Sequence, residues 1–237
     1  MSQEAIIKYL KFPLQFDATL MFSELQASIQ QQWVPHFNTG GYEGNWNVLS
    51  LYAVGGKADT IFVPLTSDLE LEETAVLKQC PYVQEVIASF HFPKIAVRLM
   101  RLEVAAVIKP HRDHELGYED GQFRLHIPIV TNSDVHFILD GEELTMRAGE
   151  CWYTNVNYEH SVVNEGTEDR IHLVIDGVRN EWSDQLFFAE ADPAQFVAPK
   201  AEMDPATIQR VIEELKRNGA ADNSELIADL EKQLKPI

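Results

Sequence analysis

Hydrophobic residues between positions 94 and 178 occur in many short runs that are rich in valine, isoleucine and aromatic residues. The runs are IAVRLMRL, AAVIKPH, FRLHIPIV, VHFILD, EELTMR, ECWYTN, HSVVN and RIHLVIDGV. Turn-forming pairs such as Asp140-Gly141 and Ala148-Gly149 separate several of them. Short strands at nearly even spacing are typical of an antiparallel sandwich or a jelly-roll barrel, and two packed sheets form a natural ligand cavity. We therefore predict a mainly β fold, a double-stranded β-helix.

Helical spacing of hydrophobic residues precedes this β region. An amphipathic helix is predicted from about Ala18 to Trp33 on the spacing of Leu20, Phe22, Leu25, Ile29 and Trp33. A second helix is predicted within Glu72–Phe90, with inward-facing Val76, Leu77, Val83, Val86 and Ile87. The run NWNVLSLYAV between the two helices is a predicted strand.

Beyond the β region the pattern becomes helical again. EWSDQLFFAEA is a predicted helix, and a linker with two prolines follows it. The segment DPATIQRVIEELKRNG has Asp204 as its predicted N-cap, a proline at the first helical position and Gly219 at its end, and SELIADLEKQL is a further predicted helix. We predict a first domain over residues 1–190 and a helical appendage over residues 200–237, which is a candidate contact for a homodimer.

Composition narrows the class of protein. The 237 residues are 45% hydrophobic, enough for one sizeable core, and the formal net charge is −18. No basic cluster is present, which argues against a nucleic-acid partner. The two cysteines, Cys80 and Cys151, form no disulfide framework. Because we find neither an export signal nor an apolar stretch of the ~20 residues that a membrane helix needs, we expect a soluble cytoplasmic protein without a membrane partner.

A candidate metal site combines a close pair of residues with a distant histidine. His111 and Asp113 are two apart, so both side chains can face one ion from a strand end. Alone, the pair is equally well explained as a surface feature. His160 opens a later predicted strand, although a partly buried structural histidine is the alternative. Two imidazoles and one carboxylate on one face of iron(II) leave three coordination positions open.

Arg170 is the third candidate element, ten residues after His160. It begins the run RIHLVIDGV, which could pair with HSVVN through the NEGTED turn. Its guanidinium would then point into the cavity of the metal site. A buried arginine calls for an anion, and the fork of a guanidinium matches a carboxylate. The alternative is an edge-strand arginine that faces solvent.

The segments VIKPHRDHELGYEDGQFRLHIPIVTN and GECWYTNVNYEHSVVNEGTEDRIHLVIDG resemble the aspartyl/asparaginyl β-hydroxylase-like family of Fe(II)/2-oxoglutarate-dependent dioxygenases. The likeness covers about residues 94–178, with fainter similarity around GNWNVLSLY. It implies a cupin-like jelly roll in which His111, Asp113 and His160 bind iron(II) and Arg170 holds the distal carboxylate of 2-oxoglutarate. It also implies dioxygen as a co-substrate and stimulation by ascorbate.

The segment RLH carries two further assignments. Arg124 and His126 are two apart on a predicted strand and should point the same way. From the resemblance, we assign His126 to 2-oxoglutarate and Arg124 to either carboxylate, that of 2-oxoglutarate or that of the substrate. Since Asp113 is present, the nearest resemblance within the family is to the bacterial amino-acid hydroxylases, which include proline hydroxylases.

The substrate is expected to be a small molecule, a free amino acid rather than a peptide or protein side chain. Arg98 and Arg101 lie on opposite faces of one predicted strand, and we favour Arg98 as a ligand of the substrate carboxylate, together with Arg124. Trp46 is a candidate wall of the substrate pocket, although an aromatic residue in a strand usually belongs to the core.

Four other polar residues receive weaker assignments. His114 is expected to face solvent, and His136 and His172 to have structural roles, with cavity lining as the alternative for His172. Asp176 is either a partner behind the ligands or a strand-end acid. Hydroxylation is the favoured activity. The alternatives are a cupin-like metal enzyme that does not use 2-oxoglutarate and a non-catalytic ligand-binding barrel.

Overall fold

The computed structural model describes residues 6–29, 33–60, 70–197, 205–217 and 223–233. Its contacts divide the chain into two compact units, Met1–Ala198 and Pro199–Ile237. We propose that these units correspond to the two domains predicted from the sequence.

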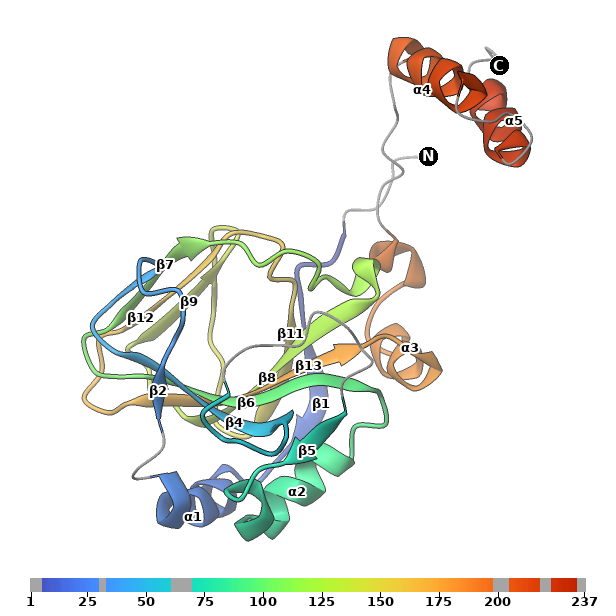
Figure 1. The fold of residues 1–237 in the computed structure, drawn as a ribbon. Coiled ribbons are helices and arrows are strands. Elements are labelled where there is room, and N and C mark those ends of the chain that lie inside the picture. The colour runs from blue at the N-terminus through green and yellow to red at the C-terminus, as the bar shows by residue number, and fades with distance from the viewer. Residues whose placement is uncertain (1–5, 30–32, 61–69, 198–204, 218–222, 234–237) are drawn as a thin grey trace. The chain divides into compact units, whose positions relative to one another are not determined.

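Two antiparallel sheets form the main part of the first unit (Figure 1). Within the described residues, the larger sheet has the strand order β1-β11-β8-β13-β6-β4-β2, with β5 paired to β4. These strands are β1 (Tyr9–Gln15), β2 (Val34–Pro35), β4 (Trp46–Val54), β5 (Leu71–Glu73), β6 (Lys94–Leu102), β8 (Gln122–Val130), β11 (Glu150–Thr154) and β13 (Arg170–Val178).

The smaller sheet has the order β10-β9-β12-β7-β3. Its strands are β3 (Tyr42–Glu43), β7 (Val107–His111), β9 (Val135–Leu139), β10 (Glu142–Leu144) and β12 (His160–Asn164). Short 3-10 helices cover Leu77–Gln79, Tyr118–Asp120 and Pro193–Phe196. The mainly β, jelly-roll architecture predicted from the short hydrophobic runs is confirmed.

The two faces of the larger sheet have different partners. Helices α1 (Ala18–Ile29) and α2 (Pro81–Ala88) lie along its outer face (Figure 1), and α3 (Glu181–Phe188) follows β13. Leu99, Leu125 and Leu173, odd-numbered residues of the central strands, are fully buried in one core with residues of all three helices. Because side chains alternate along a strand, the even-numbered residues of β6, β8 and β13 point the other way, toward the smaller sheet.

Two of the observed elements, α1 and β1, differ from the predictions. Helix α1 ends at Ile29, ahead of residues 30–32, which lie outside the described part, and Trp33 is not helical. Its Leu20 is exposed, whereas the neighbouring Met21 is buried. The second predicted helix is confirmed as α2, which lies within Glu72–Phe90 and begins at Pro81, and the five residues predicted to face inward are buried. Strand β1 was not predicted at all.

The predicted pairing of HSVVN with RIHLVIDGV is wrong. Strand β12 pairs with β7 and β9 in the smaller sheet, whereas β13 pairs with β6 and β8 in the larger sheet. Both edges of β12 are therefore taken, and the turn after it carries the chain from one sheet to the other. The first residues of the two strands, His160 and Arg170, nevertheless line the same space between the two sheets.

The second unit contains the predicted helices α4 (Pro205–Arg217) and α5 (Ser224–Gln233). They pack through Ile208, Ile212, Ile227 and Leu230, and Lys216 pairs with Glu231 at 2.7 Å. The expected cap residues Asp204 and Gly219 lie outside the described residues. No helix within the described ranges has both the length and the apolar character to cross a membrane.

Candidate active site

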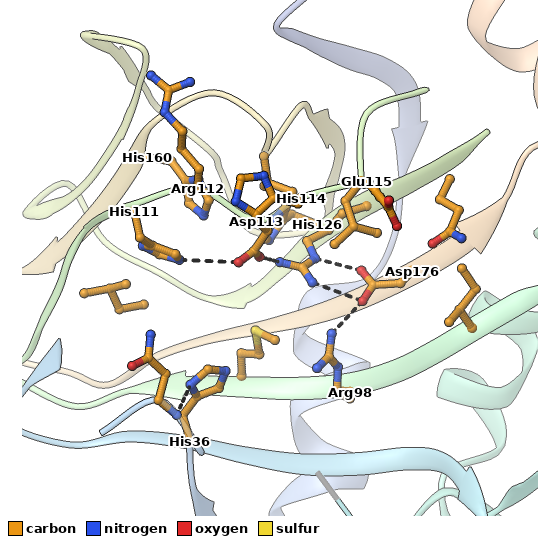
Figure 2. A pocket seen from close by; sticks show the side chains of 18 of the residues that line it. His36, Arg98, His111, Arg112, Asp113, His114, Glu115, His126, His160 and Asp176 are labelled. Carbon is orange, nitrogen blue, oxygen red and sulfur yellow. Dashed lines mark hydrogen bonds and ion pairs between the residues drawn. The ribbon is translucent and has the colours of Figure 1, made fainter. Parts of the chain in front are cut away.

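A cavity of about 560 Å³ opens between the two sheets. Its walls include every residue that the sequence analysis assigned to metal, co-substrate or substrate: Trp46, Arg98, His111, Asp113, Arg124, His126, His160 and Arg170. Figure 2 shows many of these side chains converging on the cavity from strands far apart in the sequence. The fold thus brings the predicted residues together.

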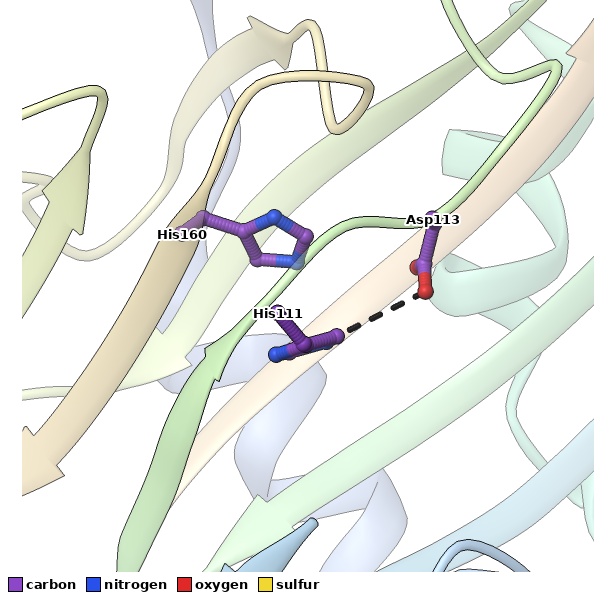
Figure 3. Close-up of side chains that lie close together, drawn as sticks. All are labelled: His111, Asp113 and His160. Atoms are coloured by element: carbon purple, nitrogen blue, oxygen red, sulfur yellow. Dashed lines mark ion pairs between the residues drawn. The ribbon is translucent and has the colours of Figure 1, made fainter.

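His111, Asp113 and His160 form a compact group (Figure 3). His111 ends β7 and lies directly opposite His160, the first residue of β12, with ring centroids 4.2 Å apart. Asp113 lies just past the end of β7, where its backbone N–H donates to the Val156 carbonyl at 2.9 Å. One ligand atom from each of the three side chains lies within 4.8 Å of the other two, close enough for all three to bind one ion.

The hydrogen bonds of the two histidines orient them for a metal. Nδ1 of His111 lies 2.8 Å from the Lys109 carbonyl, and Nδ1 of His160 lies 3.1 Å from the Tyr158 carbonyl. A carbonyl can only accept, so we infer that both Nδ1 atoms carry a proton, which leaves Nε2 as the nitrogen of each ring that can bind a metal. Burial lowers the pKa of His160 to about 4, which keeps this imidazole neutral near pH 7.

The carboxylate of Asp113 is ionised. Burial alone would raise its pKa, but the Arg124 guanidinium and the two imidazoles outweigh burial and hold the pKa below its ordinary value. Nη1 of Arg124 donates to Asp113 Oδ2 at 2.6 Å, whereas Oδ1 lies 3.9 Å from Nε2 of His111. One oxygen is thus engaged by an arginine and the other faces the imidazoles.

A second carboxylate lies behind this group. Asp176 faces Arg124 across the β13–β8 pair and accepts from its Nε at 2.7 Å and its Nη2 at 3.1 Å. Arg98, on β6, donates to the same carboxylate at 2.6 Å (Figure 2). Burial would raise the pKa of Asp176, but the two guanidinium groups hold it below its ordinary value. Arg98, Asp176, Arg124 and Asp113 form a chain of alternating charge.

Arg170 lies in the cavity wall with no carboxylate partner in the described part of the chain. It is 2% exposed, donates to Nδ1 of His172 at 2.8 Å and lies over the Phe137 ring. Burial lowers its pKa to about 9, so it is charged near pH 7. Both ring nitrogens of nearby His126 are buried without a hydrogen-bond partner. A buried cation beside unsatisfied polar atoms fits a ligand with a carboxylate.

The weaker assignments divide between the cavity and the surface. His114 is exposed and lies on the cavity rim, and His136 lies outside the cavity and contacts Glu143 at 2.6 Å. His172 is buried behind Arg170 and is not part of the cavity wall. Arg101 points away from the cavity and stacks on Trp33 at 4.7 Å.

His36 is a cavity residue that the sequence analysis missed. It directly follows β2 and stacks on Trp46 with ring centroids 3.6 Å apart. Burial lowers its pKa to about 4, so the ring is neutral near pH 7. No periodicity marks a lone histidine after a two-residue strand. Only the pairing of β2 with β4, which carries Trp46, places His36 at the cavity.

The donor set of the site fits iron(II). Two imidazoles and one carboxylate are the donor set of mononuclear non-haem iron sites, which keep open positions for further ligands. The hydrogen bonds from both Nδ1 atoms to backbone carbonyls are the usual support for such ligands. Arg170 and His126 fit the carboxylate of 2-oxoglutarate.

Comparison with known proteins agrees with this arrangement. Residues 16–180 match the aspartyl/asparaginyl beta-hydroxylase family. L-proline cis-3-hydroxylase 1 of Streptomyces sp is 32% identical over 56% of this chain and 47% of its own length. L-proline cis-4-hydroxylase of Rhizobium meliloti (strain 1021) is 27% identical over 59% of this chain and 51% of its own length. The chain spans about half the length of these curated relatives.

Among solved structures, an oxidoreductase of the 2OG-Fe(II) oxygenase family from Burkholderia pseudomallei has a TM-score of 0.48 and 15% identity, and covers 73% of this chain and 86% of its own. So distant a likeness supports no statement about chemistry. The family match, in contrast, extends over most of the first unit and includes all the metal-site residues and Arg170. The chain belongs to the aspartyl/asparaginyl beta-hydroxylase family.

Proposed function

We propose that this protein is an Fe(II)/2-oxoglutarate-dependent dioxygenase that hydroxylates a free amino acid. In the balanced reaction, one dioxygen, one 2-oxoglutarate and one substrate C–H give succinate, carbon dioxide and the hydroxylated product. Iron(II), when bound, would supply the oxygen activation and the oxidative decarboxylation of 2-oxoglutarate. The chain supplies the ligands, the anchoring cations and a cavity that limits access of water.

The observation that carries the proposal is the presence of two complementary features in one cavity. One is the His111, Asp113 and His160 group, whose ligand atoms lie within 4.8 Å of one another. The other is the buried guanidinium of Arg170, which lacks a carboxylate partner within the described residues. A cupin-like metal enzyme without 2-oxoglutarate needs the first feature but not the second. A non-catalytic barrel needs neither.

Each anchoring residue has a proposed task. Arg170 holds the distal carboxylate of 2-oxoglutarate with its fork of N–H donors, and His126 donates one hydrogen bond to the same molecule. Arg98 binds the substrate carboxylate, and Arg124 contributes a second positive charge next to it. Trp46 forms the apolar wall that fixes the substrate against the metal site.

A free amino acid is favoured as the substrate for two reasons. Arg98 is 4% exposed, so a carboxylate must enter the cavity to reach it, and a free amino acid can do so more readily than a protein side chain. The two curated relatives are also L-proline hydroxylases. L-Proline is therefore the first substrate to test.

The test is succinate formation from 2-oxoglutarate by the purified chain with iron(II) and ascorbate, with each amino acid and several short peptides in turn. We expect one free amino acid to stimulate turnover and to gain one oxygen atom by mass spectrometry. Omission of dioxygen, or the variant His160→Ala, should abolish both signals. Equal substrate turnover with and without 2-oxoglutarate would refute the proposal and favour a metal enzyme of another class.

A further inference from the structure

Asp176 is a buried carboxylate that makes no hydrogen bond or ion pair with His111, Asp113 or His160, yet it is linked to that group through Arg124. It is 2% exposed and accepts three hydrogen bonds from two arginines. Two of them come from Arg124, from Nε at 2.7 Å and from Nη2 at 3.1 Å. Since Asp176 and Arg124 are direct partners across β13 and β8, the backbone itself sets this contact.

The contact fixes the direction of the remaining donor of Arg124. A guanidinium is planar and rigid, so two hydrogen bonds along one edge determine where its other nitrogen points. In Arg124 that nitrogen is Nη1, which donates to Oδ2 of Asp113 at 2.6 Å. Oδ1 of Asp113 is left facing His111, 3.9 Å from Nε2. The orientation of the Asp113 carboxylate therefore depends on Asp176.

We propose that Asp176 is a positioning residue that, through Arg124, orients Asp113 so that one of its oxygens stays available to the metal. This inference rests on the proposed function, because it assigns Asp113 to the metal. Without Asp176, the fork of Arg124 can turn to Asp113 and engage both of its oxygens. The two arginines would also lose a negative charge that partly neutralises them, so they would repel a divalent cation more strongly.

Asp176 also ties the two ends of the cavity together. Arg98, the proposed ligand of the substrate carboxylate, donates to the same Oδ2 atom that accepts from Nη2 of Arg124. The Asp176 carboxylate thus binds both Arg98, the proposed ligand of the substrate, and Arg124, which donates to the proposed metal ligand Asp113. Its loss should change the affinity of the metal site as well as that of the substrate site.

The test compares binding of cobalt(II), a spectroscopic substitute for iron(II), by the full-length protein and its Asp176→Asn variant. The amide has nearly the volume of the carboxylate, so the change removes the charge and replaces one acceptor oxygen by an N–H donor that cannot bind an arginine. We expect about ten- to a hundredfold weaker cobalt(II) binding, the usual effect of losing a partner behind a metal ligand. The ligand-field absorption bands of bound cobalt(II) should also shift, which a general loss of stability would not cause.

A matched control is Asp184→Asn. Asp184 likewise pairs with an arginine, Arg179, at 2.7 Å and accepts from Tyr118, but it lies outside the cavity. This variant should bind cobalt(II) with the affinity and spectrum of the unmodified protein. An equal loss in both variants would overturn the inference, because the effect would then be unspecific.

Burial of two arginines without Asp176 can impair folding, so a second variant is needed. The double variant Asp176→Asn/Arg98→Met restores the charge balance and leaves Arg124 without its anchor. We expect it to show the same weakened cobalt(II) binding as the single variant. Unaltered binding in either folded variant would overturn the positioning role while leaving the proposed function intact. Failure of the unmodified protein to bind cobalt(II) or iron(II) would overturn both.

Discussion

Replacement of Arg170 by methionine should raise the stability of the metal-free protein but weaken its binding of 2-oxoglutarate. The opposite signs allow the two effects to be told apart. The guanidinium is 2% exposed and has no carboxylate partner in the described structure. Burial lowers its pKa from the ordinary arginine value to about 9, which corresponds to roughly 5 kcal/mol of destabilisation at neutral pH. Arg170→Met removes this cost at similar length, so the metal-free variant should melt at a higher temperature than the unmodified protein.

Binding of 2-oxoglutarate should become much weaker in the same variant. Removal of one partner from a buried, hydrogen-bonded charge pair costs about 2–5 kcal/mol, or about 30-fold to about 4,000-fold in Kd. Metal binding should be unchanged, since Arg170 contacts His172 and Phe137 and forms no hydrogen bond or ion pair with His111, Asp113 or His160.

The assay is calorimetric titration of the cobalt(II)-loaded protein with 2-oxoglutarate and with 2-oxobutanoate, which lacks the distal carboxylate. The unmodified protein should strongly prefer 2-oxoglutarate, and Arg170→Met should bind both compounds equally weakly. Arg101→Met is the control, because Arg101 lies on β6, outside the cavity, and pairs with Glu103 at 2.8 Å. If the variant retained the preference for 2-oxoglutarate, our assignment of Arg170 would be wrong.

Three further predictions follow from the site and the fold. His160→Ala removes one of three metal ligands and should weaken cobalt(II) binding by more than about 100-fold, measured by absorption titration; tight binding would contradict the metal assignment. The metal-free protein should lose stability as the pH falls from about 6.5 toward 4, because His36 has a pKa near 4 when folded and only the unfolded chain takes up its proton in that window. His36 should lower the free energy of unfolding by up to about 3 kcal/mol over this pH range. A urea midpoint that does not change between about pH 7 and about pH 5 would contradict this prediction. Deletion of residues 199–237 should leave the affinities for cobalt(II) and 2-oxoglutarate unchanged, since the cavity residues lie in the first unit; loss of either affinity would refute the proposed domain division.

The strands of the jelly roll could be predicted because their local chemistry is simple. The run RIHLVIDGV is strand β13 over its whole length, as Val, Ile and Leu fit a strand that is buried on both faces. Strand β1 was not predicted because it is an edge strand whose hydrophobic pattern is interrupted by Lys11 and Pro13. Leu10 and Phe12 are buried, but Lys11 is exposed and Pro13 lies at a shift in the register, where its missing N–H is tolerated.

The sequence did not allow us to predict equally well which strands pair with each other. The wrong pairing of β12 with β13 arose from the assumption that strands joined by a short turn form a hairpin. In a double-stranded β-helix such a turn can instead cross between the sheets, and only long-range pairing decides the outcome. The same limitation explains why His36 was missed, since its place depends on a contact between β2 and β4.

The division of the site between the two sheets explains the special place of Asp113. His111 and His160, the imidazoles of the proposed metal site, come from the smaller sheet, whereas the arginines proposed to bind carboxylates come from the larger one. Asp113 belongs to neither, since it lies just past the end of β7. Its backbone follows the smaller sheet, but its side chain bonds Arg124 of the larger sheet. The Asp113 carboxylate therefore links the proposed metal site to the proposed anion-binding side of the cavity, so a change that shifts one sheet against the other should first disturb the contact between Asp113 and Arg124.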